Sequence, residues 1–402
     1  MLHRLFFCSL LMVALFFVAC GDDDDDDNDS ENESFSPPEG WRMELVDEAD
    51  QRYYIENKIA LRAADEPVIL YYNKNTKKDR FFPYHLELAS RRSSWRSETL
   101  LHEECDGDTS LVIDANDVIH FVRGLHDSNS PYPSDYILYY GNNSEGDFRY
   151  EELPPIASDG WLWNFSMALD SQATPHIIIG TPDEILIYDW TKSGWQTLFP
   201  VDTEEAFISI DGNDNMHFAF YVSGDFDDDD EGTSEEIDKR GKLFHVHNAK
   251  GEWEWEQLED LRFASIGTYQ ATSIWDVIID SDADGNTHLV YTISYDGGHD
   301  LSKIVSKYAT NKSGEWKTKE FPDKGFSSFV LDHDANPNIL IYDEDRNFHL
   351  LHFDGDEWSD TPMGIPFGIS FIAIDSDNYV HLSYANAYLE TNFLYYLTNR
   401  PE

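Results

Sequence analysis

The feature that most constrains the fold of this chain is a repeat that occurs seven times between residues 41 and 402. In a typical copy a short run of β-forming apolar residues ends in Asp, and a His six residues later begins a second such run. The Asp residues of six copies are Asp114, Asp170, Asp211, Asp280, Asp332 and Asp375. Asn338 takes the His place after Asp332, two extra residues separate Asp280 from His288, and the first copy, residues 59–72, is degenerate. Such self-similarity is typical of repeat folds, so the copies are predicted to be structurally equivalent.

Each copy predicts four strands. A third run rich in Tyr, Leu and Ile follows the second, and a polar turn then leads to a fourth run that opens on an aromatic residue. These aromatic residues are Trp95, Phe148, Trp195, Trp253, Trp316 and Trp358. Turns of Asn, Gly, Ser and Asp between such runs indicate hairpins, and four short strands per repeat form the blade of a β-propeller. We predict an all-β fold, a single seven-bladed β-propeller; two β-sandwiches with accidental similarity are the alternative.

The two ends of the repeat region complement each other. The seventh copy stops after its third run, whereas residues 41–46 resemble a fourth strand and precede the first copy. An N-terminal strand that completes the last blade closes the ring and removes an exposed sheet edge. We therefore predict that the last blade is completed by this N-terminal strand.

The first 40 residues predict export and anchoring. Residues 1–19 combine Arg4 with an apolar run and a small residue, which is the pattern of a signal peptide. The stretch 17–20 resembles the lipobox of bacterial lipoproteins, which implies that Cys20 is lipidated. Residues 20–40 are polar and rich in Asp, so we predict a disordered tether that leads to a propeller over residues 41–402. An ordinary signal peptide with a chance Cys is the alternative.

Localisation and partners follow from this terminus and from the charge. The resemblance implies an exported outer-membrane lipoprotein of the bacterial cell envelope, surface-exposed or facing the periplasm, that touches the membrane through its lipid anchor only. The net charge is -50, from 28 Lys and Arg against 78 Asp and Glu. Nucleic-acid binding is excluded because phosphate recognition needs a basic face. The same charge repels anionic substrates and favours cationic partners or saline surroundings.

The repeated Asp and His residues indicate structure rather than catalysis. An enzyme needs one site, whereas a residue present in nearly every blade serves a need that every blade has. We expect the Asp carboxylates to accept hydrogen bonds from turn amides and the Trp rings to pack between neighbouring blades. A functional site is therefore expected where the copies differ.

One difference has the form of a metal site. Residues 280–285 contain the run D-x-D-x-D-G, which resembles the calcium loops of EF-hands and of integrin-type propellers. The resemblance implies a weak calcium site, the one cofactor predicted, made by Asp280, Asp282, Asp284 and Asn286. Tyr291 stands where an EF-hand has Glu, and His288 where the integrin-type loop has Asp. An acidic turn without a cation is the alternative.

A second difference lies in the loops that join fourth to first and second to third strands, which share one face of a propeller. Aromatic rings together with Arg and His suit a sugar or peptide ligand. The predicted ligand-binding face consists of Trp161, Trp163, Trp275, Tyr269, Arg123, His126, Tyr132, Tyr295 and His299. Trp275 is equally compatible with a place in the core.

No catalytic motif appears in the sequence, so no catalytic residue is assigned and enzymatic activity is left open. The blade pattern resembles propellers of exported bacterial lipoproteins and, more distantly, the sialidase-like BNR-type group, without the sialidase Asp-box. The absence of a catalytic motif favours a non-catalytic module that binds a glycan or a protein. The alternatives are a polysaccharide-degrading lyase or glycosidase, with His126, His299 and Arg123 as candidates for base and charge stabilisation, and a structural subunit of an envelope assembly.

Overall fold

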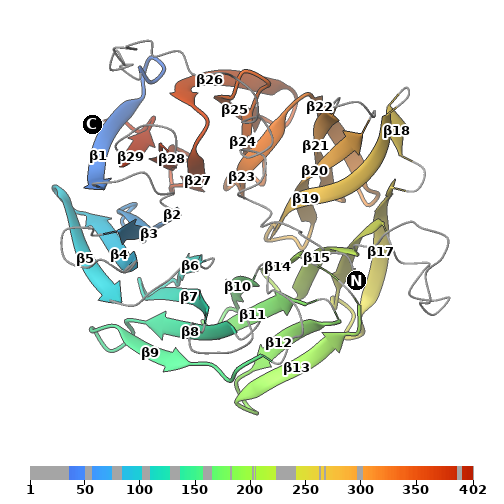
Figure 1. Ribbon diagram of the computed structural model, residues 1–402, viewed down its shortest axis with the longest axis horizontal. Helices are drawn as coiled ribbons and strands as arrows, with labels where there is room; N and C mark the ends of the chain where they lie inside the picture. The colour runs from blue at the N-terminus through green and yellow to red at the C-terminus, as the bar shows by residue number, and fades with distance from the viewer. Residues whose placement is uncertain are drawn as a thin grey trace, which may run out of the picture. The chain divides into compact units, whose positions relative to one another are not determined.

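The computed structural model describes residues 36–49, 57–74, 84–101, 109–126, 136–156, 165–181, 183–201, 203, 205–222, 241–261, 264–266, 269–296, 302–386 and 392–401. Pro37–Glu402 form one compact unit. Its described residues form 29 strands in seven sheets, which follow one another around a ring (Figure 1). Within the described ranges, no helix has the length and apolar character needed to cross a membrane. The predicted all-β, seven-bladed propeller is confirmed.

Each sheet is called a blade and numbered in chain order. The first-named strand of blades 1 to 6 lies nearest the centre of the ring (Figure 1). Blade 1 contains β2 (Asn57–Leu61), β3 (Pro67–Lys74), β4 (Tyr84–Arg91) and β5 (Trp95–Leu101). Blade 2 contains β6 (Thr109–Ile113), β7 (Ile119–His126), β8 (Tyr136–Asn142) and β9 (Arg149–Glu152). Blade 3 contains β10 (Phe165–Leu169), β11 (Pro175–Gly180), β12 (Ile185–Asp189) and β13 (Gly194–Phe199).

The next three blades repeat this order. Blade 4 contains β14 (Glu205–Ile210), β15 (Met216–Val222), β16 (Lys242–His247) and β17 (Glu254–Asp260). Blade 5 contains β19 (Tyr269–Ser281), β20 (Thr287–Asp296), β21 (Ser302–Thr310) and β22 (Lys317–Pro322), and the short β18 (Ser265–Ile266) pairs with the start of β19. Blade 6 contains β23 (Gly325–Leu331), β24 (Pro337–Tyr342), β25 (Asn347–Phe353) and β26 (Trp358–Pro366).

Blade 7 joins the two ends of the chain. It contains β27 (Ile369–Ile374), β28 (Val380–Ala385), β29 (Asn392–Thr398) and β1 (Arg42–Ala49). The strand β1 pairs antiparallel with β29, from Arg42 opposite Thr398 to Ala49 opposite Asn392. Figure 1 shows the blue β1 beside the red strands of the C-terminal end. The predicted closure by the N-terminal strand is confirmed.

The hydrophobic core lies between neighbouring blades. In blade 3 the consecutive residues Ile177, Ile178 and Ile179 are at most 1% exposed, because the adjacent blades cover both faces of the second strand. Ile177 packs in a cluster with residues of blade 2, and Ile178 packs in a cluster with residues of blade 4. A continuous apolar run in the second strand therefore reflects burial on two sides.

Trp residues that open fourth strands reach toward the preceding blade. The Trp95 ring contacts the Tyr396 ring of blade 7 edge to face, with 5.2 Å between the ring centroids. Trp358 lies 5.5 Å from Tyr308 of blade 5 in the same manner. Trp195 donates its indole N–H to the Pro154 carbonyl at 2.8 Å. The predicted role of these rings between the blades is confirmed at these positions.

Candidate functional site

The turn between the first and second strands has one conformation in all seven blades. In blade 3, Asp170 Oδ1 accepts hydrogen bonds from the amides of Gln172 at 2.9 Å and Thr174 at 2.8 Å, and His176 Nε2 lies 3.3 Å from Asp170 Oδ2. The same two amide bonds are made to Asp114, Asp211, Asp282, Asp332 and Asp375. The third position after the turn-opening residue has a positive φ in every blade, at Asp65, Asp117, Ala173, Asp214, Gly285, Ala335 and Asn378. The repeated Asp and His residues thus hold the turns.

Blade 5 departs from the predicted alignment. Asp282, not Asp280, opens its turn, because Asp282 N donates to Asn286 O and Asp282 Oδ1 accepts from the amides of Asp284 and Asn286. His288 then follows at the regular spacing, and its Nε2 lies 3.6 Å from Asp282 Oδ2. The prediction of two extra turn residues is wrong, because the additional residues extend β19 instead of the turn.

This alignment gives the D-x-D-x-D-G run a structural role. Asp282 accepts three hydrogen bonds, two from amides and one from Asn286 Nδ2 at 2.8 Å, and Gly285 takes the left-handed position that every blade has. Asp284 is exposed. Calcium binding by Asp280, Asp282, Asp284 and Asn286 stays a prediction.

A cavity of about 550 Å³, called here the turn-side cavity, opens among the innermost strands of blades 2 to 5. It lies at the end of these strands where the Asp–His turns begin. Its polar lining includes Asn116, Ser171, Gln172, Ser209 and Asp280. Asp280 also lines an adjoining cavity of about 270 Å³ between blades 5 and 6.

Asp280 marks the place where the innermost strands differ. Two positions before the turn-opening residue, the other six blades carry Ala60, Val112, Ala168, Ser209, Val330 and Ala373. On the neighbouring strand, each of these residues pairs with the residue that occupies the His position of its own blade, as Asp280 pairs with His288. A carboxylate therefore replaces a small or apolar side chain in one blade of seven.

The surroundings of Asp280 disfavour its charge. Burial raises the pKa of this carboxyl to about 6, although hydrogen bonds from the amides of Ser281 and Leu331 and from Ser209 act in the opposite direction. Burial also raises the pKa of Asp276, which has a φ of 53° within the irregular part of β19. Carboxyl groups kept in positions that disfavour their charge often belong to functional sites.

The substitution Asp280→Asn is expected to stabilise the protein at pH 8 and to have little effect at pH 4. A folded-state pKa above the ordinary value makes the wild type lose stability as the pH rises through about 6. The amide has no such titration, so the expected gain at pH 8 is roughly 1–3 kcal/mol. Urea unfolding at both pH values in EDTA measures it, with Asp284→Asn as the exposed control. Equal effects of Asp280→Asn at the two pH values would contradict the assignment.

The predicted ligand-binding residues are only partly within the described structure. Arg123 is fully buried and Tyr295 is 4% exposed, whereas Trp275 is half-buried in β19. His126 ends β7 and Tyr269 begins β19, but their side chains are not among those that the structure describes. Four residues of this face lie outside the described ranges: Tyr132, Trp161, Trp163 and His299. The predicted lipidation residue Cys20 also lies outside them. Binding by this face stays a prediction.

Blade 4 contains a group of histidines, His217, His245 and His247, that the repeat pattern alone does not predict. In blades 2, 5 and 7 the His of the repeat contacts a tyrosine hydroxyl through Nδ1, as in His120–Tyr140 at 2.6 Å. In blade 4 His245 occupies the tyrosine place, and its Nε2 lies 3.2 Å from His217 Nδ1. His247 pairs with His217 on the neighbouring strand β15. Aligning the third strands of the blades would have revealed this exchange.

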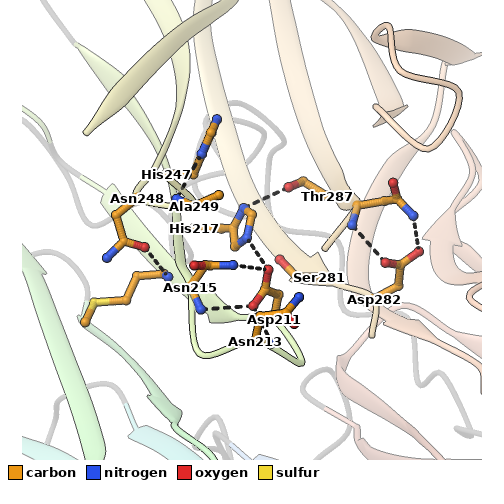
Figure 2. A network of polar contacts seen from close by, with 12 residues as sticks. Asp211, Asn213, Asn215, His217, His247, Asn248, Ala249, Ser281, Asp282 and Thr287 are labelled. Atoms are coloured by element: carbon orange, nitrogen blue, oxygen red, sulfur yellow. Dashed lines mark hydrogen bonds and ion pairs between the residues drawn. The ribbon is translucent and has the colours of Figure 1, made fainter. Parts of the chain in front are cut away.

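Polar groups surround these histidines on both sides. Figure 2 shows Asp211 between its turn amides and His217, with Thr287 of blade 5 on the other side of the ring. The His217 Nε2 lies 3.4 Å from Asp211 Oδ2, and the Thr287 hydroxyl lies 3.0 Å from His217 Nδ1. Burial lowers the pKa of His217 to about 4, so its imidazole is neutral at pH 7. The hydrogen bond with His245 lowers the pKa of Glu256 to about 2.

Comparison of the sequence with protein families finds no matching family, and comparison with curated proteins finds no match. Solved structures do match. The polysaccharide lyase Uly1 aligns with a TM-score of 0.54 and 11% identity, over 88% of this chain and 90% of that chain. The α-L-arabinanase of Penicillium chrysogenum aligns with a TM-score of 0.48 and 9% identity, over 89% and 97% of the two chains. The NanB sialidase of Streptococcus pneumoniae aligns with a TM-score of 0.41 and 9% identity, over 88% and 70%. At such identities the likeness concerns the fold alone.

Proposed function

We propose that this chain is a cell-envelope β-propeller lipoprotein, anchored through Cys20, that binds a neutral glycan without cleaving it. The observation that carries the proposal is Asp280, whose carboxyl group lines the turn-side cavity although burial there disfavours its charged form. The anchor rests on the amino-terminal sequence pattern and on the polar stretch that follows it.

The size and lining of the turn-side cavity suit a short sugar chain. Its volume of about 550 Å³ falls among those of ordinary small-molecule sites. Asn116, Gln172 and Asp280 offer donors and acceptors for hydroxyl groups, and Met167 and Ile208 offer apolar contact. Amide, hydroxyl and carboxylate groups beside aliphatic ones match the mixed surface of a carbohydrate.

The charge of the cavity selects against acidic sugars. Among the described residues that line it there is no Lys, Arg or His, whereas Asp114, Asp170 and Asp280 contribute carboxylates. An anionic sugar would meet these groups without a compensating cation and would also meet a chain of net charge -50. A neutral sugar instead donates hydroxyl hydrogen bonds to the carboxylates. Such a bond is stronger than a hydrogen bond between two neutral groups.

A glycan array probed with residues 37–402 is expected to show binding to neutral oligosaccharides and none to uronate or sialylated ones. The Asp280→Asn variant is expected to bind about tenfold more weakly, because an amide replaces a charged acceptor. Since this variant is expected to be at least as stable as the wild type, its loss of binding would not reflect unfolding. Trp161→Ala is the comparison that distinguishes the turn-side cavity from the predicted ligand-binding face. Binding confined to anionic glycans, or binding unaffected by Asp280→Asn, would overturn the proposal.

A polysaccharide-degrading activity is the second candidate. The fold is similar to that of a polysaccharide lyase, and Asp276 and Asp280 are two acids of raised pKa on one innermost strand. A carboxyl that titrates near neutrality is suited to general acid–base catalysis. Incubating the bound glycans with the protein and measuring new reducing ends separates the two candidates, since a binding module releases none.

A further inference from the structure

The histidine group of blade 4 places three metal-ligating side chains together. His245 and His247 are two residues apart on β16, so the strand period points both to the same face. Glu256 lies opposite His245 on β17, and its Oε2 is 2.9 Å from His245 Nδ1. One ligand atom from each of His245, His247 and Glu256 lies within 4.8 Å of the other two. In the part of the chain that the structure describes, this is the one such group of His, Cys, Asp or Glu.

The chemistry of these groups matches a transition-metal ion. Two imidazoles and one carboxylate form a known ligand set for Zn²⁺, with a fourth position left for water. His245 is fully buried, whereas the side chain of His247 is 14% exposed and that of Glu256 is 43% exposed. The partial exposure of His247 and Glu256 leaves the group open to solvent, whereas the inner ligand His245 is held by packing.

Further contacts orient the ligands as outer partners do in metal proteins. The Trp316 indole N–H donates to Glu256 Oε2 at 3.0 Å from blade 5. On the inner side, His245 Nε2 faces His217 Nδ1 at 3.2 Å and the Thr287 hydroxyl at 3.3 Å. With the His245 proton on Nε2, the ring donates to these acceptors and presents the Nδ1 lone pair toward His247 and Glu256. Such a second partner commonly fixes the tautomer of a metal-binding histidine.

We propose that His245, His247 and Glu256 bind one divalent transition-metal ion, with Zn²⁺ as the reference case, at the boundary between blades 4 and 5. The ion replaces the hydrogen bond between His245 Nδ1 and Glu256, and the proton that Nδ1 carried is then on His245 Nε2, which leaves a neutral imidazole as the ligand. Blade 2 shows what the position looks like without this group, since Tyr140 and Asn142 stand in the places of His245 and His247. The exchange of both residues in one blade is the difference that the metal accounts for.

The variants follow from the blade comparison. His245→Tyr and His247→Asn copy the residues of blade 2 and should preserve the fold, and Glu256→Gln removes the carboxylate at a partly exposed position. His352→Asn is the matched control, because His352 occupies in blade 6 the place of His247 and has Leu350 where blade 4 has His245.

The test is titration of residues 37–402, which contain all seven blades, with Zn²⁺ against a chromophoric chelator in excess Mg²⁺. The wild type and His352→Asn are expected to bind one Zn²⁺ per chain. Each blade 4 variant is expected to bind roughly a hundredfold more weakly, at least as large a loss as removal of outer partners causes. Co²⁺ should show visible d–d bands in the wild type that disappear in His247→Asn.

Two results would overturn the proposal. One is the absence of a stoichiometric ion in the wild type when Mg²⁺ suppresses weak binding to the acidic surface. The other is equal Zn²⁺ affinity in the wild type, Glu256→Gln and His247→Asn. Circular dichroism of each variant confirms that a loss of binding does not reflect a loss of fold.

Discussion

Deleting residues 37–49 is expected to abolish the cooperative unfolding transition of the propeller or to shift its midpoint to much lower urea. The deletion removes β1, which pairs with β29 along its length. Blade 7 is then left with three strands and an open edge. The deletion also removes side-chain contacts to blade 1. Asp47 accepts hydrogen bonds from the Tyr71 hydroxyl at 2.7 Å and from Asn73 Nδ2 at 2.8 Å.

Glu44 adds a second connection across the closure. Its carboxylate pairs with Arg91 at 2.8 Å and accepts the Trp95 indole N–H at 3.0 Å. With about 1 kcal/mol for each hydrogen bond, the strand and these contacts together account for a loss of roughly 5 kcal/mol or more, comparable to the whole stability of many domains.

Urea unfolding followed by tryptophan fluorescence measures this effect. The reference is the chain that begins at residue 37, because it keeps β1 and lacks only the preceding segment. Gel filtration of the deleted form should also show self-association through the exposed edge of β29. Similar midpoints for the two chains would contradict the view that closure of the ring stabilises the fold.

The second large effect is expected for Asp375→Ala. Asp375 Oδ1 accepts from the amides of Asp377 and Tyr379, and its Oδ2 lies 3.0 Å from His381 Nε2 and 2.6 Å from Arg400 Nη1. The carboxylate side chain is fully buried. Although burial alone would raise its pKa, the hydrogen bonds from His381 and the turn amides lower it below the ordinary value.

Removing this carboxylate leaves the buried His381 Nε2 and the two turn amides without their acceptor, while Arg400 keeps its ion pairs with Asp65 and Asp377. The expected loss of unfolding free energy is about 3–5 kcal/mol, the range for breaking a buried charged network by deleting one partner. The matched control is Asp332→Ala in blade 6, where the same turn amides are bonded but Asn338 takes the His place. We expect about 1–2 kcal/mol there, from lost turn bonds alone. Equal losses in the two variants, measured by urea unfolding, would show that His381 and Arg400 add nothing.

The repeat predicted the architecture because strand period, turn chemistry and burial act locally in each copy. The apolar run of Ile177–Ile179 indicated a strand, and Trp95 and Trp358 indicated rings placed between blades. The closing strand followed from the mismatch between the two ends. None of these features requires knowledge of which residues approach one another from different blades.

The candidate sites were less predictable because they depend on register. The repeat spacing predicts Asp280 as the turn residue of blade 5, and only the extra length of β19 shows that Asp282 has this role. Asp280 instead lies near the end of the extended strand and lines a cavity. A shift of this kind changes the neighbours of a side chain while leaving the local pattern intact.

The sequence alone determined the number of blades, the strand order within each blade and the closure at the termini, because these follow from short-range patterns repeated seven times. The meeting of His217 and Thr287 between two blades, and the burial that raises the pKa of Asp280, were decided only by the tertiary structure. Their physical reason is long-range: separate blades pack against one another, and a side chain acquires its electrostatic environment from residues far away in the chain.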